Sequence, residues 1–175
     1  MPSPVGHVLA GLAVHVAVSR APFELWDARR AALAVGAALA PDLDLLLRFV
    51  DGRNHHQAES HSLGAAGLAA LLTVVAARVG RASAPGRLAL AVGLAWLSHV
   101  GLDWLGRDTN PPIGLLALWP LSHAWWKCPW PVFLDIGRTL DWATLRHNAL
   151  AAAWECVLVL PLFLLVVRAR SRAQE

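Results

Sequence analysis

Charged side chains are scarce in this sequence of 175 residues: they make up 15% of it, whereas hydrophobic residues make up 57%. Soluble proteins have roughly 25% charged residues, so this shortage argues against a soluble domain and indicates a membrane protein. The net charge of +3 comes from scattered arginines with a single lysine, Lys127. Because no basic cluster is interleaved with aromatic residues, no nucleic-acid partner is expected. The length requires only one domain, over residues 1–175.

Cysteine is also rare. Cys128 and Cys156 lie far apart and neither belongs to a CxxC pair, so both are predicted to be free thiols. The apolar N-terminal stretch lacks a lysine or arginine before it, and a cleaved signal peptide therefore fits poorly.

What the sequence does contain is five apolar segments, at residues 5–19, 31–47, 63–79, 88–105 and 148–167. They predict an all-α, integral membrane bundle of about five helices. A bilayer span needs roughly 17–25 residues, so the shorter segments are expected to tilt or to stop part-way, and the last is the clearest span. The segment between the fourth and fifth helices, residues 106–147, is rich in tryptophan, which is typical of the membrane interface.

The basic residues predict an orientation for this bundle. If all five segments cross, nine of the fifteen lysines and arginines fall on the side of the C-terminus, in short loops and a short tail. The other six are spread over longer connections. The positive-inside rule then places the N-terminus outside and the C-terminus in the cytoplasm.

On this topology the ionisable residues of the separate helices converge at the outer side. His99 and Asp103 lie four residues apart and share a helical face, so they can bind one metal ion. Ionisable groups within membrane segments are costly and usually functional. The predicted metal ligands are His7, Asp42, Asp44, His56, His61, His99 and Asp103. The alternative is a set of polar residues gathered at the interface by helix ends.

Three aspartates of this set lie toward the C-terminal ends of their helices, where the helix dipole disfavours negative charge. Because no lysine or arginine lies within those helices, a divalent cation is the expected counter-charge. Mixed imidazole and carboxylate ligands favour zinc or another transition metal. The ligands outnumber those of one zinc ion, so two ions are an alternative. Glu155 and Asp44 are the candidate catalytic proton carriers.

Two local details qualify the set. Asp42 and Asp44 point in different directions on a regular helix, so joint ligation requires the helix to unwind, which Pro41 favours. Ser60 is a candidate N-cap for the third helix, and His55 is interpreted as an ordinary loop residue.

The motifs "SPVGHVLAG", "GAALAPDLDLL", "HHQAESHSLGA", "LSHVGLDWL" and "GLLALWPLS" occur in this order. They resemble the LexA-binding, inner-membrane-associated metal-dependent hydrolases of bacteria, over roughly residues 3–122. The resemblance implies a phospholipase-like activity and the same seven metal-site residues. The family's loop usually reads H-R-G-x-T-H-S, whereas this chain has Gln57 and Ala58, and Arg53 is the candidate to replace the missing arginine.

The expected function is therefore a membrane-bound metal-dependent hydrolase that cleaves a lipid-like ester or phosphoester with activated water, and its expected partners are membrane lipids. The alternative is a non-catalytic membrane protein, either regulatory or a metal transporter, with a structural metal site. Transport is disfavoured because the second to fourth helices have almost no polar residues in their cytoplasmic halves.

Overall fold

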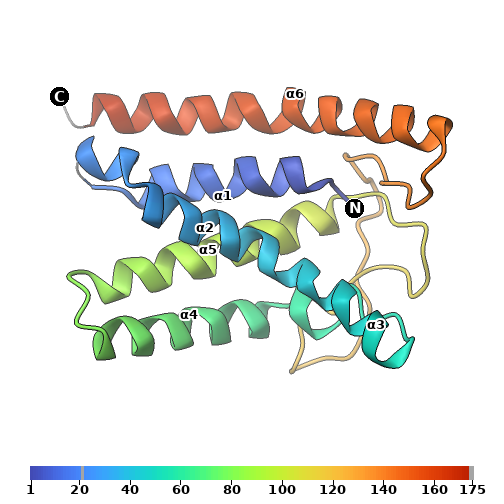
Figure 1. Cartoon of the computed structure of the whole chain (residues 1–175), viewed down its shortest axis with the longest axis horizontal. Helices are drawn as coiled ribbons and strands as arrows, with labels where there is room; N and C mark the ends of the chain where they lie inside the picture. The colour runs from blue at the N-terminus through green and yellow to red at the C-terminus, as the bar shows by residue number, and fades with distance from the viewer. Residues whose placement is uncertain (21, 174–175) are drawn as a thin grey trace.

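The computed structural model describes residues 1–20 and 22–173, and five long helices dominate this part of the chain (Figure 1). They are α1 (Pro4–Val18), α2 (Ala28–Leu39), α4 (Leu63–Val79), α5 (Pro85–Trp104) and α6 (Trp142–Arg172). Short helical turns lie between them: η1 (Pro22–Trp26), η2 (Ala40–Leu47), α3 (Arg48–Asp51) and η3 (Glu59–His61). The described residues form no β-strand beyond two isolated bridges. The predicted all-α class and five helices are confirmed.

The second predicted segment differs from the observed helix. The apolar segment was predicted over residues 31–47, but α2 ends at Leu39 and the chain continues as the 3₁₀ helix η2. Pro41 causes the change, because proline lacks the N–H that the next α-helical hydrogen bond requires. The expected unwinding at Pro41 is thus confirmed, and it occurs where Asp42 and Asp44 lie.

Small side chains hold the centre of the bundle together. α1 packs against α2, α5 and α6, and α5 also packs against α2 and α4. The buried core consists of Ala34, Ala37, Ala38, Val92 and Ala95. Such small residues let helix backbones approach closely, which is the usual packing of helices in lipid.

Large apolar side chains instead point outward. α4 exposes Leu68, Leu71, Leu72 and Val75, and α6 exposes a longer row that includes Val157, Leu162 and Leu165. Among the described helices, α6 alone is long and apolar enough to cross a membrane, whereas α1 and α4 are apolar but shorter. At 1.5 Å per residue, the 31 residues of α6 extend over about 46 Å, more than the hydrocarbon core of a bilayer.

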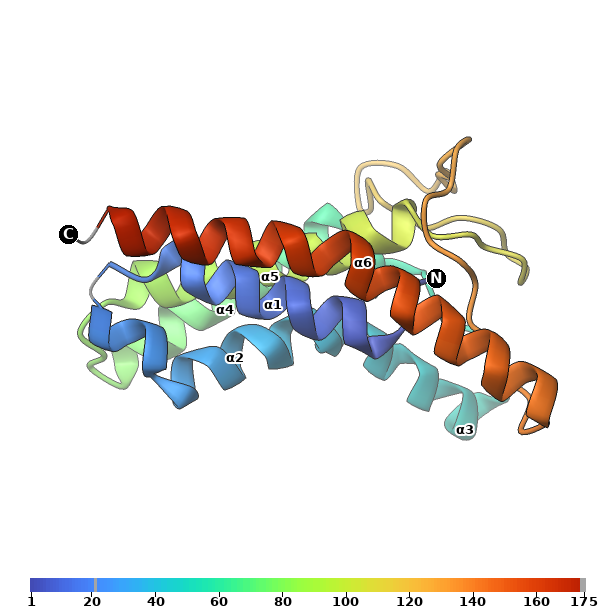
Figure 2. The ribbon, with the colours of Figure 1, turned by 90° about the horizontal axis from the view of Figure 1, so that it is seen from above.

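The two ends of the bundle differ in character (Figure 2). One end holds the N-terminus, η2, α3 and the irregular segment between α5 and α6. In that segment Trp125, Trp126 and Trp130 are exposed, as expected for an interfacial region. The cysteines are free, and Cys128 is buried there. The other end holds the α1–α2 connection, the α4–α5 connection and the end of α6.

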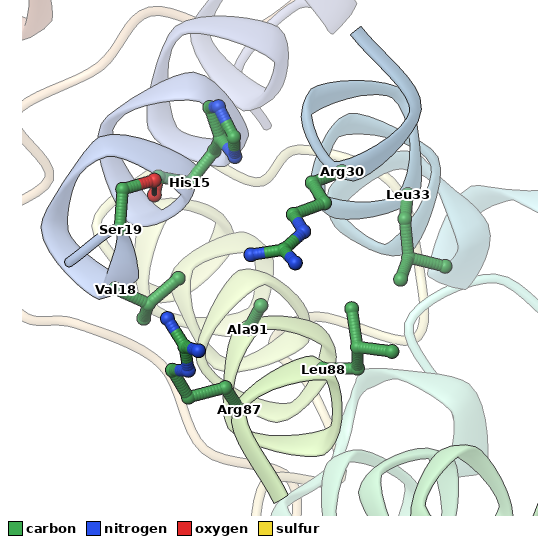
Figure 3. A pocket seen from close by; sticks show the side chains of 8 residues that line it. All are labelled: His15, Val18, Ser19, Arg30, Leu33, Arg87, Leu88 and Ala91. Atoms are coloured by element: carbon green, nitrogen blue, oxygen red, sulfur yellow. Dashed lines mark hydrogen bonds between the residues drawn. The ribbon is translucent and has the colours of Figure 1, made fainter. Parts of the chain in front are cut away.

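An ion-pair network closes this second end. Glu24 of η1 contacts Arg30 of α2 at 2.6 Å and Arg87 of α5 at 2.8 Å. The backbone N–H of Arg20, which donates to Glu24, and the two guanidiniums outweigh the effect of burial and hold the pKa of Glu24 at about 2. His15 is buried and lines a small cavity beside both arginines (Figure 3). The network ties α1, α2 and α5 together.

We predict that Gly11→Ala destabilises the bundle. A Cβ at this position would lie 3.0 Å from both the Cβ of Ala38 and the Cα of Val35, so α1 and α2 must separate. Overpacking of this kind costs about 1–3 kcal/mol of unfolding free energy. The measurement is thermal unfolding in detergent. Gly36→Ala in α2 is the control, because its Cβ would meet nothing within 4 Å. Equal melting temperatures for the two variants would contradict the close approach.

Candidate metal centre

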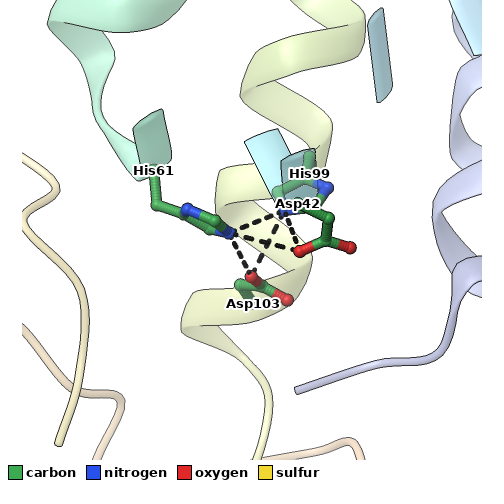
Figure 4. A group of neighbouring side chains, drawn as sticks. All are labelled: Asp42, His61, His99 and Asp103. Atoms are coloured by element: carbon green, nitrogen blue, oxygen red, sulfur yellow. Dashed lines mark hydrogen bonds and ion pairs between the residues drawn. The ribbon is translucent and has the colours of Figure 1, made fainter. Parts of the chain in front are cut away.

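Four donor atoms from three segments meet at the end of the bundle that holds the N-terminus (Figure 4). They belong to Asp42 of η2, His61 of η3, and His99 and Asp103 of α5. The Nε2 atoms of His61 and His99 lie 3.0 Å apart. The Oδ2 atom of Asp103 lies 3.1 Å from the first and 3.3 Å from the second. The Oδ1 atom of Asp42 lies 3.6 Å from each.

These five separations are compatible with a tetrahedral coordination shell. Donor atoms placed 2.0–2.1 Å from a zinc ion at the corners of a tetrahedron lie about 3.3 Å from one another. The five separations given above range from 3.0 to 3.6 Å. The four side chains are therefore arranged as they would be around one ion, and the group can hold a metal.

Hydrogen bonds orient the two imidazoles for this role. Nδ1 of His99 lies 2.7 Å from the carbonyl oxygen of Ala38, which only accepts hydrogen bonds, so Nδ1 carries the proton. Nδ1 of His61 lies 3.1 Å from Oδ2 of Asp44 and therefore also donates. The lone pair of each Nε2 atom then points into the group. Histidine ligands of metals are usually held by such a second hydrogen bond.

The break in α2 supplies one of these partners. In a 3₁₀ helix the carbonyl of Ala38 would accept from the N–H of residue 41, three positions ahead. That residue is Pro41, which has no N–H. His99 donates to this carbonyl, so the proline that redirects the chain also leaves an acceptor for a candidate ligand.

Asp44 lies behind His61 rather than beside Asp42. Its Oδ1 atom is 2.8 Å from Nδ1 of His56, and its Oδ2 atom accepts from the hydroxyl of Ser60 at 2.6 Å. The donor atoms of Asp44, His56 and His61 are also close enough to hold an ion. However, a neutral imidazole carries a proton on one of its nitrogens, so His61 offers only one lone pair. Asp44 and His56 are thus placed to support His61, with one ion at its Nε2 atom.

His7 approaches the group from α1. Its ring stacks on His99 with the centroids 3.9 Å apart, and its Nε2 atom lies 3.5 Å from Oδ1 of Asp103. His7 is completely buried. Both of its ring nitrogens, both Asp103 oxygens and Oδ1 of Asp42 lack a hydrogen-bond partner within the described chain. Buried polar atoms are normally paired, so this convergence of unpaired atoms supports an ion or a small ligand at the group.

Burial and charge oppose each other at His61, which precedes α4. Burial disfavours a charge on the ring, but the nearby carboxylates of Asp103, Asp42 and Asp44 raise its pKa well above the usual value of 6.5. The carboxylates therefore favour a positive charge at this place. A divalent cation satisfies the same requirement, as the sequence predicted from the aspartates at helix ends.

The structure places Glu155 at the start of α1, and its role as a proton carrier stays a prediction. This side chain of α6 is fully buried, and its oxygens accept hydrogen bonds from Ser3 N–H at 2.6 Å, the Ser3 hydroxyl at 2.6 Å and Gly6 N–H at 3.0 Å. These groups form the start of α1, where the helix dipole favours a negative charge. Glu155 thus fixes the first turn of the helix that carries His7.

The structure also shows the contacts of Ser60, Ser62 and His55, which lie next to the predicted histidine ligands. Ser62, not Ser60, is the N-cap of α4, since its hydroxyl accepts from Ala65 N–H at 3.0 Å. The Ser60 hydroxyl lies 2.9 Å from Nδ1 of His61, and sequence reasoning missed this contact because both serines flank the histidine. His55 pairs with Asp51 at 2.6 Å, outside the group, as interpreted from the sequence.

A family described as YdjM inner membrane protein matches residues 1–174. The chain belongs to this YdjM family. The match confirms an inner-membrane family, and LexA binding and hydrolysis stay predictions. Neither the curated proteins nor the solved structures contain a match.

We predict that the group holds a metal in the purified protein and that its members differ in importance. Asp103→Asn and His99→Ala should remove the ion, because each deletes a donor atom. Asp44→Asn should weaken binding by roughly 10–100-fold, the usual effect of a partner outside the ligand shell. Elemental analysis and competition with a chelator measure both. His55→Ala is the control, and metal contents equal to that of the unmodified protein in all variants would refute the site.

Proposed function

We propose that this YdjM-family protein is a metal-dependent hydrolase of the inner membrane that cleaves a lipid-like ester or phosphoester. The observation that carries the proposal is the tetrahedral group of Asp42, His61, His99 and Asp103. Its two imidazoles and two carboxylates suit zinc better than magnesium or calcium, which prefer oxygen ligands alone. A bound ion would supply activation of water and polarisation of the substrate's oxygen.

Access to the group supports catalysis. The side chain of Asp42 is 22% exposed, whereas those of His61, His99 and Asp103 are fully buried. Asp42 also lines a cavity of about 330 Å³ that includes residues from η2, α3 and the segment after α5. A substrate can therefore reach the group at Asp42, whereas the other three side chains are covered by the protein.

His7 is the residue that we assign to proton transfer. Hydrolysis joins the oxygen of water to the carbon or phosphorus atom, and the departing alcohol oxygen takes up a proton. A base must therefore accept a proton from the water and return it. His7 is buried beside Asp103 with both ring nitrogens unpaired, so its Nε2 atom is free for this exchange. Asp44 instead orients His61.

One observation favours a structural ion as the second candidate function. Four protein donors complete a tetrahedral shell, as in structural zinc sites, whereas catalytic sites keep one position open. In that case Asp42 would stay bound throughout, and the protein would be a non-catalytic regulatory membrane protein.

In our proposal several helices cross the membrane, and the metal group lies at the outer membrane surface. Besides α6, the helices α4 and α5 expose rows of leucine, which suits contact with lipid tails. The arginines of the two connections opposite the site and of the end of α6 share one end of the bundle, so the positive-inside rule places that end in the cytoplasm. The metal group, the N-terminus and the exposed tryptophans then lie at the outer interface.

We predict zinc-dependent turnover of a soluble ester or phosphoester by the protein in detergent. A chelator should abolish it and zinc should restore it. His7→Gln should lower kcat by roughly 10²–10⁴-fold, the contribution of a general base, while the metal content stays unchanged. His123→Gln, at an exposed position outside the group, is the control. Fully loaded protein without turnover on any ester would instead favour the structural ion.

We predict that a cysteine at Asn110, which is exposed near the site, reacts with an impermeant maleimide added to intact spheroplasts. A cysteine at Ser83, in the connection between α4 and α5, should react only after lysis. Both are placed in a Cys128→Ser, Cys156→Ser background. The reverse pattern would invert the proposed orientation.

A further inference from the structure

The cavity beside Asp42 has an unusual charge arrangement. Arg48 of α3, and Arg107 and Arg138 of the segment between α5 and α6, line it together with Asp42. None of these three guanidiniums lies within 4.0 Å of a carboxylate of the described chain; the arginines that do are Arg30 and Arg87, at the other end. The cavity thus brings three unpaired cations to the open side of the metal group.

The other carboxylates that line the cavity are already engaged. Asp108 is buried and accepts from Gly114 N–H at 2.7 Å and Asn110 N–H at 3.1 Å. The Asp135 carboxylate lies 3.7 Å from Nε2 of His147, and it accepts from the Thr109 hydroxyl at 3.5 Å. The hydrogen bond of His147 Nε2 goes to the carbonyl oxygen of Asp135 at 2.8 Å. Asp42 belongs to the metal group. The arginines are therefore free to bind an anion from outside.

Arginine presents several N–H donors in one plane, and this pattern matches the oxygens of phosphate. The same cavity has an apolar side, formed by Leu45 of η2 and Phe49 of α3. Phe49 is 86% exposed, and Leu46, Leu47 and Val50 beside it are exposed as well. A ligand with a phosphate at one end and a hydrocarbon chain at the other would contact both sides.

We infer that this cavity binds the phosphate of an anionic lipid through Arg48, Arg107 and Arg138, with the hydrocarbon chain along Leu45 and Phe49. Arg53, the candidate for this role from the sequence, does not line the cavity. As the substrate assignment, this inference rests on the proposed hydrolase function. As a binding site, it follows from the cavity alone.

The test is a titration of the purified protein, treated with a chelator, with short-chain phosphatidic acid. The intrinsic tryptophan fluorescence or the heat of binding is measured. Short-chain phosphatidylcholine with the same acyl chains and inorganic phosphate are the two comparison ligands. We expect phosphatidic acid to bind at least tenfold more tightly than either. Inorganic phosphate binding equally tightly would overturn the lipid assignment.

Substitutions distinguish binding by the arginines of the cavity from a general effect of positive surface charge. Arg48→Gln and Arg107→Gln should each weaken phosphatidic acid binding by about tenfold, or about 1.4 kcal/mol, because each removes a charge-assisted hydrogen bond. Arg53→Gln removes the same charge from a neighbouring exposed loop and should leave binding unchanged. Melting temperatures verify that each variant is folded. Equal affinities for phosphatidic acid and phosphatidylcholine, or equal losses in all three variants, would overturn the inference.

Because binding is measured without the ion and without turnover, the two proposals fail separately. Tight, arginine-dependent binding of phosphatidic acid by a protein that hydrolyses nothing would support the cavity and contradict the hydrolase. Turnover with a KM that Arg48→Gln and Arg107→Gln leave unchanged would support the hydrolase and overturn the cavity.

Discussion

The burial of the Asp103 carboxylate is the constraint on which this end of the molecule depends. A buried carboxylate is costly unless other groups pair with it, and no lysine or arginine of the described chain does so. Its neighbours are three imidazoles, those of His7, His61 and His99, which come from three separate segments. α1, η3 and α5 must therefore meet at one point, and a divalent cation is the counter-charge that satisfies all of them.

Helix packing makes this meeting possible. Gly11 and the alanines of the core let α1, α2 and α5 approach closely, so the residues at their ends lie within reach of one another. α6 contributes through Glu155, which accepts three hydrogen bonds from the start of α1. The clearest membrane span is thus joined directly to the helix that carries His7. The hydrogen bonds of Glu155 therefore link the position of α6 to the position of His7 in the site.

Much of this arrangement could be predicted from the sequence. Apolar runs indicate the helices, and the position of an ionisable residue within a run shows which end of the helix carries that residue. The five helices and the convergence of His61, His99 and Asp103 followed in this way. The roles of Asp44 and Glu155 did not. Both are acidic residues near the same end of the bundle. Only the path of the backbone decides that Asp44 faces Nδ1 of His61 and that Glu155 faces the start of α1. Linear spacing contains no such information.

The two ends of the bundle also bear on the choice between hydrolysis and transport. A transport path requires polar groups through the membrane, but the buried cluster between the metal group and the Glu24 network consists of alanine and valine. The Glu24 network itself is closed by two arginines. An ion at Asp42 has an opening through the cavity at its own end of the bundle. A site that opens on one side only suits a reaction with a molecule that arrives and leaves at the same membrane surface.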